Sequence, residues 1–68
     1  MNDTGERIKK EVEEALRIRP EGLTITDASK RTALNYMTVS KYLAILRAEN
    51  KVDYVQIGMA KLFKLKVR

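Results

Sequence analysis

The side chains best placed to do chemistry are the lysines and arginines of the later part of the chain. Residues 23–68 hold nine basic and three acidic side chains, a balance of 9 − 3 = +6, whereas residues 1–22 hold five and six, a balance of 5 − 6 = −1. Such an excess attracts a polyanion through Coulomb forces. Two alternatives stay open for these charges, namely ordinary solubility and the protection of an edge strand against aggregation. The densest group of cations follows Gly58 and consists of Lys61, Lys64, Lys66 and Arg68.

The composition argues against catalytic and metal-binding chemistry. The 68 residues include no cysteine and no histidine, so the usual zinc ligands and the commonest general base are missing. Ser29 and Ser40 have no histidine to activate them, and the sequence has no glycine-rich phosphate loop. We therefore expect no enzymatic activity, no metal, no cofactor and no small-molecule ligand.

The hydropathy pattern carries no membrane signal. No apolar stretch approaches the length of a membrane span, and the first residues lack the apolar core of a signal peptide. We therefore expect a cytoplasmic protein without a membrane partner. From the length of 68 residues, we expect residues 1–68 to form a single domain.

Apolar side chains at helical spacing predict two helices in the first half of the chain. The first covers about residues 5–18, with Asp3 as its N-cap. The second covers about residues 27–32, with Thr26 as its N-cap. Leu23 to Ile25 is expected to be a short extended segment, the minor third strand of a small sheet.

A third helix is predicted at about residues 36–50. Asn35 is a strong N-cap residue, and Asn50 tolerates the left-handed conformation that ends many helices. The side chains expected on the inner face of this helix recur at the positions i, i+3, i+4 and i+7. The side chains on it are Val39, Tyr42, Leu43 and Leu46.

After Asn50 the hydrophobic period changes from that of a helix to that of a strand. Alternating side chains on both sides of Gly58 predict a hairpin at about residues 51–67. We expect this hairpin to have one apolar face and one strongly basic face. The predicted fold class is therefore α+β, in the order helix, short strand, helix, helix, strand, strand.

The second and third helices are typical of a helix-turn-helix, because a tight turn joins them and the later helix is longer and capped. In such a unit the later helix enters the major groove of DNA, and its first residues reach base edges. A surface helix without a ligand also exposes small polar residues, so that alternative stays open. The candidate DNA contacts are Asn35, Tyr36, Met37, Thr38, Ser40, Lys41, Ala44 and Arg47 of the helix, with Lys61 and Lys64 of the hairpin.

The run LTITDASKRTALNYMTVSKYL, residues 23–43, resembles the helix-turn-helix of archaeal and bacterial winged-helix transcriptional regulators. That family has an extended Ile-Thr, a short helix, a Thr-Gly-Leu-Ser turn and then Thr-Val-Ser-Arg-Tyr-Leu. The segments NKVDY at 50–54 and GMAKLF at 58–63 resemble the wing of these proteins. The resemblance implies a winged helix-turn-helix fold, double-stranded DNA as the partner and a role in transcriptional control.

The sequence departs from that family pattern at four positions, of which Asn35 in place of the cap serine is an equally good cap. Ala33 replaces the turn glycine, and a positive φ there would cost about 1 kcal/mol. Lys41 replaces an arginine and so keeps the charge but loses the bidentate fork for guanine. Met37 stands where a polar residue is common. We therefore expect residues 36–44 to give a modest sequence preference and the basic strand after Gly58 to supply much of the affinity.

Three other functions of the same fold stay open. A protein-interaction module would use an exposed apolar patch, for which Met37, Ile45 and Met59 are the candidates. A non-specific architectural protein would bind DNA without reading its sequence. An RNA-binding protein would stack bases on exposed aromatic rings, for which Tyr36 and Tyr54 are the candidates.

A homodimer on paired half-sites is also an open alternative. Its contact would be formed by an edge strand or by the first helix, through Ile8, Val12 and Ile18.

Overall fold

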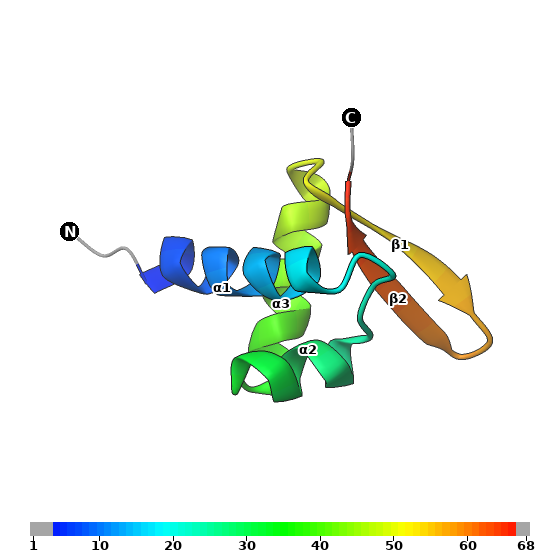
Figure 1. The fold of residues 1–68 in the computed structure, drawn as a ribbon. Coiled ribbons are helices and arrows are strands. Elements are labelled where there is room, and N and C mark those ends of the chain that lie inside the picture. The colour runs from blue at the N-terminus through cyan, green and yellow to red at the C-terminus, as the bar shows by residue number, and fades with distance from the viewer. Residues whose placement is uncertain (1–3, 67–68) are drawn as a thin grey trace.

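The computed structural model describes residues 4–66 and consists of three helices followed by a two-stranded antiparallel sheet (Figure 1). This arrangement confirms the predicted α+β winged helix-turn-helix fold. The predicted cap Asp3 and the last predicted hairpin residue, Val67, lie outside the described residues. No helix within residues 4–66 is long and apolar enough to cross a membrane. The elements are α1 (Thr4–Ile18), α2 (Ile25–Thr32), α3 (Tyr36–Ala48), β1 (Val52–Ile57) and β2 (Ala60–Leu65).

Apolar side chains from every element meet in one core. Each Val or Leu that is fully buried contributes about 1.5–3 kcal/mol relative to an exposed position. Val12, one of the residues suggested for a homodimer contact, is not available for it, because this side chain is fully buried within the chain itself. Ile8 is half-buried against the same core, whereas Ile18 is 54% exposed. The core residues are Val12, Ala15, Leu16, Leu23, Ala28, Val39, Leu43, Leu46, Val52 and Phe63.

Helix α2 begins two residues earlier than the sequence predicts. Its N-cap is Thr24 rather than Thr26, and the Thr24 hydroxyl accepts a hydrogen bond from the Asp27 backbone N–H at 3.1 Å. The predicted third strand shrinks to Leu23 alone, which exchanges two backbone hydrogen bonds with Phe63 at 2.9 and 2.8 Å. Both threonines are good caps, and the pairing of Leu23 with β2 selects the earlier one.

The turn between α2 and α3 has the left-handed residue that the family pattern places there. Ala33 adopts φ 62° and ends α2. The Thr32 hydroxyl donates to the Ala28 carbonyl at 2.8 Å and accepts from the Leu34 N–H at 3.3 Å. Asn35 caps α3 as predicted, since its side-chain oxygen accepts a hydrogen bond from the Met37 N–H at 2.7 Å.

Helix α3 ends at Ala48, two residues before the predicted end. Asn50 has φ 68°, the left-handed conformation expected of it. Its N–H bonds to the Arg47 carbonyl at 3.0 Å, and the Lys51 N–H bonds to the Leu46 carbonyl at 2.9 Å. This pair of bonds is a Schellman motif, which closes the helix and turns the chain into β1.

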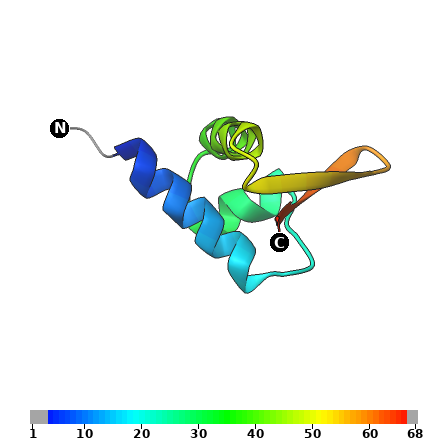
Figure 2. The same ribbon diagram turned by 90° about the horizontal axis from the view of Figure 1, so that it is seen from above.

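The hairpin extends away from the helices, as the view from above shows (Figure 2). Its register pairs Tyr54 with Phe63 and Val55 with Leu62. The face toward the core therefore carries Val52, Tyr54, Gln56, Lys61, Phe63 and Leu65. The opposite face carries Asp53, Val55, Ile57, Ala60, Leu62 and Lys64.

The prediction of one apolar and one strongly basic hairpin face is wrong. The outer face holds four apolar residues and the single pair Asp53 and Lys64, whereas Lys61 lies on the inner face. Side chains alternate along β2, so Lys61 and Lys64 face opposite ways, and the register adds the apolar Val55 and Ile57 of β1 to the face that carries Lys64.

Candidate nucleic-acid interface

Helix α3 turns one side to the core and leaves the other side open. Val39, Leu43 and Leu46 are fully buried, so the opposite side faces solvent. There Tyr36 is 50% and Met37 is 73% exposed. The other candidate contacts on this side are Lys41, Ala44 and Arg47, all exposed, and Ser40, half-buried.

A hollow of about 450 Å³ lies between the first turn of α3, the start of α2 and the hairpin tip. Ser40 and Lys61 approach it from α3 and β2, so the hollow joins the helix to the wing. Thr38 lies two residues from Ser40, about 200° around the helix, and therefore sits on the other flank. The lining residues are Thr24, Ile25, Thr26, Tyr36, Ser40, Met59, Ala60 and Lys61.

A second hollow, of about 420 Å³, lies beside the last turns of α3 and the base of the hairpin. Lys66 reaches across it and donates a hydrogen bond to the Asn50 side-chain oxygen at 2.8 Å. Arg47 lines the same hollow, and its Nε lies 3.9 Å from an Asp53 carboxylate oxygen. The lining residues are Ala44, Arg47, Ala48, Asn50, Val52, Asp53 and Lys66.

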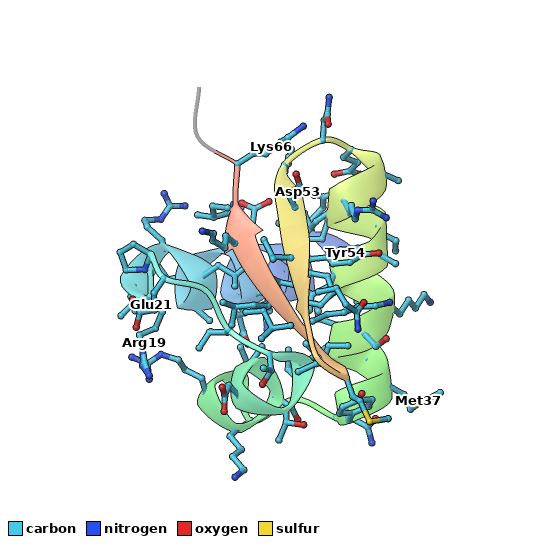
Figure 3. All side chains as sticks on the ribbon, turned by 90° about the vertical axis from the view of Figure 1, so that its right-hand side faces the viewer. Arg19, Glu21, Met37, Asp53, Tyr54 and Lys66 are labelled. Atoms are coloured by element: carbon cyan, nitrogen blue, oxygen red, sulfur yellow. The ribbon has the colours of Figure 1, made fainter. Side chains whose placement is uncertain are left out.

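Tyr54 connects a cation of α3 with a cation of the wing. Its side chain points from β1 toward α3 (Figure 3). The Arg47 guanidinium carbon lies 4.5 Å from the centre of the Tyr54 ring, and the Lys61 nitrogen lies 5.0 Å from it. The ring also packs against Phe63, with the two ring centres 5.3 Å apart. Both cations are thereby held beside the side of α3 that borders the wing.

Some of the predicted DNA contacts line the two hollows beside the hairpin, and the others lie elsewhere on α3 or on the outer face of the hairpin. Tyr36, Ser40, Ala44, Arg47 and Lys61 line the two hollows. Met37 and Lys41 project from the exposed side of α3. Asn35 acts as a helix cap, and Thr38 sits on the far flank.

Lys64 is separated from Lys61 by the plane of the sheet. It pairs across the strands with Asp53 on the outer face, whereas Lys61 pairs with Gln56 on the inner face. Its aliphatic part packs near Gly22, where an added Cβ would meet Lys64 Cγ at 3.0 Å. The two wing lysines therefore do not follow one line on the surface.

Sequence reasoning did not find the contacts of Tyr54 with Arg47 and Lys61. The strand pattern places Tyr54 on the inner face, but its alignment with Arg47 depends on how the hairpin crosses α3. The spacing from Tyr54 to Lys61 does become informative once the turn at Gly58 is known, because the pairing register then puts both side chains on one face.

We found no matching family model and no matching curated protein for this chain. Solved structures do share its fold. The PcaV transcriptional regulator from Streptomyces coelicolor, in complex with its natural ligand, has a TM-score of 0.81 and 24% identity, over 87% of this chain and 43% of that chain. This chain thus spans less than half of the regulator's length.

Two Zalpha domains match over nearly their whole length. The apo-Zalpha domain of zebrafish PKZ has a TM-score of 0.82 and 24% identity, over 90% of this chain and 94% of that chain. The Zalpha domain of Carassius auratus PKZ in complex with Z-DNA has a TM-score of 0.81 and 18% identity, over 91% and 97%. At these identities the likeness establishes the winged helix-turn-helix fold alone.

Proposed function

We propose that this protein binds double-stranded DNA, with α3 in the major groove and the wing on the phosphate backbone. The observation that carries the proposal is the open side of α3, bordered by hollows that Arg47 and Lys61 line. A helix fits the major groove, and cations on both sides of it can neutralise the flanking phosphates. The net charge of +5 favours the same partner.

The finer proposal is a transcriptional regulator with a modest sequence preference. Small side chains at Ser40, Ala44 and Ala48 let α3 approach the base edges closely. Lys41 supplies one cation on the exposed side, and it can act as a point charge toward guanine acceptors or a phosphate. Among structures of the same fold, PcaV is described as a transcriptional regulator, which supports this proposal.

The test of DNA binding is a fluorescence-anisotropy titration of a labelled duplex between about 50 and 200 mM salt. Affinity should fall linearly in a plot of log affinity against log salt. Lys41→Ala should weaken binding, since it removes the central cation of the exposed side. A left-handed alternating CG duplex belongs in the same series because a Zalpha domain of this fold is described in complex with Z-DNA. A preference for that duplex would replace major-groove docking by another mode on the same surface.

Lys61 and Lys64 form a matched pair for testing the docking geometry. Both are exposed lysines on β2, but they lie on opposite faces of the hairpin. Lys61→Ala should flatten the salt slope by about 0.9, as expected for one lost phosphate contact. Lys64→Ala should change it much less. Equal effects of the two substitutions would refute docking through the side of the wing that faces α3.

The outer face of the hairpin supports a second candidate function, that of a protein-interaction module. Val55 is 50% and Ile57 is 58% exposed, and they pair with Leu62 and Ala60 on the same face. Contiguous exposed apolar side chains of this kind mark interaction surfaces in many proteins. If this surface is the functional one, Val55→Ser should abolish partner binding, and all duplexes should bind weakly at physiological salt.

A further inference from the structure

We propose that Met37 reads the methyl groups of thymine in the major groove, so that the protein prefers A·T-rich duplexes. This inference rests on the proposed DNA-binding function and names the base feature that α3 recognises. It starts from one large apolar side chain that the fold leaves exposed in the first turn of α3.

Met37 is the second residue of α3, and its side chain is 73% exposed. In Figure 3 it projects from the N-terminal end of the helix, away from the core. The first turn is the part of such a helix that reaches base edges. Tyr36, which is 50% exposed, precedes it and lines the hollow below the wing together with Met59. Moving apolar surface of this kind out of water and against an apolar part of the ligand is favourable.

The usual hydrogen-bonding readers of bases are absent from α3 or already engaged. Bidentate recognition of adenine requires asparagine or glutamine, and neither occurs within Tyr36–Ala48. The side-chain oxygen of Asn35 is occupied by the Met37 N–H. Arg47, the helix's one arginine, lies against Tyr54 and near Asp53. The open side of the first two turns is left with Met37, Lys41 and the hydroxyls of Tyr36 and Ser40.

Thymine is the base that complements this surface. Its C5 methyl is the one apolar group among the major-groove edges of the four bases. Lys41 on the same side of α3 and Lys61 across the hollow border the apolar residues with positive charge. That border fits a polyanion better than an apolar protein partner. The occupant of this surface is therefore a thymine-bearing duplex.

The experiment compares duplexes that differ by single methyl groups. The first pair is an A·T-rich duplex with thymine and the same duplex with uracil. The second pair is a G·C-rich duplex with cytosine and the same duplex with 5-methylcytosine, which restores a methyl in the major groove. Each duplex is titrated with the wild type, Met37→Ala and Met59→Ala. Met59 is the other exposed methionine of the interface and lines the hollow from the wing tip, so its variant tests whether the wing rather than α3 makes the methyl contact.

The wild type should bind the methyl-bearing member of each pair more tightly, by about fourfold for each methyl that becomes buried. Met37→Ala should bring both ratios close to one, whereas Met59→Ala should preserve them. Because Met37 is so exposed, the variant should keep the thermal midpoint of the wild type.

Equal wild-type affinity for the thymine and uracil duplexes would overturn the inference and leave DNA binding intact. A thymine preference that persists in Met37→Ala would also overturn it, since the difference would then come from duplex shape. Loss of the ratio in Met59→Ala instead would assign the contact to the wing. If none of the duplexes binds even at low salt, the proposed function itself fails.

Discussion

Tyr54 offers the sharpest test of how the interface is organised, because it touches cations from two different elements. Tyr54→Leu removes the ring under Arg47 and Lys61, whereas Tyr54→Phe keeps the ring and removes the hydroxyl. Neither substitution changes the charge of the protein. The pair of variants therefore separates the position of the two cations from their number.

The expected size of the effect follows from the ordering of two long side chains. Each flexible side chain that must become immobile on binding costs about 0.5–1.5 kcal/mol. In the wild type, Arg47 and Lys61 are already restrained by cation–π contacts at 4.5 and 5.0 Å. Releasing both should weaken DNA binding by at least about 1 kcal/mol, or about fivefold. The slope of log affinity against log salt should stay unchanged, because the same phosphates are still neutralised.

The assay is the anisotropy titration at several salt concentrations, with the wild type and both variants. Tyr54→Leu also loses the ring contact with Phe63, so the folded fraction at the assay temperature must be confirmed by circular dichroism. Tyr54→Phe should bind like the wild type. Wild-type affinity in Tyr54→Leu, or equal weakening in Tyr54→Phe, would refute the idea that the ring positions the cations.

Two further predictions concern stability. Ala33→Gly should raise the free energy of unfolding by about 0.5–1 kcal/mol, because glycine relieves the strain of alanine at φ 62°. The thermal midpoint should then rise by about 2–8 °C. The matched change Ala44→Gly, at an exposed position of α3, should lower the midpoint. The Lys9 ammonium donates a hydrogen bond to Glu49 at 2.8 Å, which lowers the pKa of Glu49 below its ordinary value of 4.5. The stability advantage of the wild type over Lys9→Met should therefore be constant near neutral pH and shrink as the pH falls below about 4.5. An advantage that persists at pH 2 would contradict this assignment.

Local chemistry made α3 and its cap predictable. Asn35 precedes a clear helical stripe, and one carboxamide oxygen is enough to satisfy the Met37 N–H. The predicted end of α3 lies two residues late because it takes Asn50 as the end of the helix, whereas the left-handed conformation of Asn50 already belongs to the turn. An offset of one or two residues is common at helix ends.

The missed features depend on contacts between distant residues. Thr24 and Thr26 are equivalent as caps in isolation, and the bridge from Leu23 to Phe63 decides between them across 40 positions of chain. Lys61 and Lys64 lie on opposite sides because side chains alternate along a strand, whereas the strand register was needed to show which residues of β1 share each face with them. The candidate contacts on α3 could be listed from the sequence, but their grouping into hollows with the wing could not.

The bridge between Leu23 and Phe63 also has a mechanical consequence. Two backbone hydrogen bonds and a buried phenyl ring anchor the hairpin at its middle, while Gly58 and Met59 at the tip are exposed. The wing is therefore attached to the body near Phe63, whereas its tip has open space around Gly58. We expect any bending to concentrate between Phe63 and the tip at residues 58–59, so that the gap between the tip and α3 can widen while the core stays undisturbed. A wing attached in this way could fit its tip to grooves of different width while its attachment near Phe63 stays unchanged.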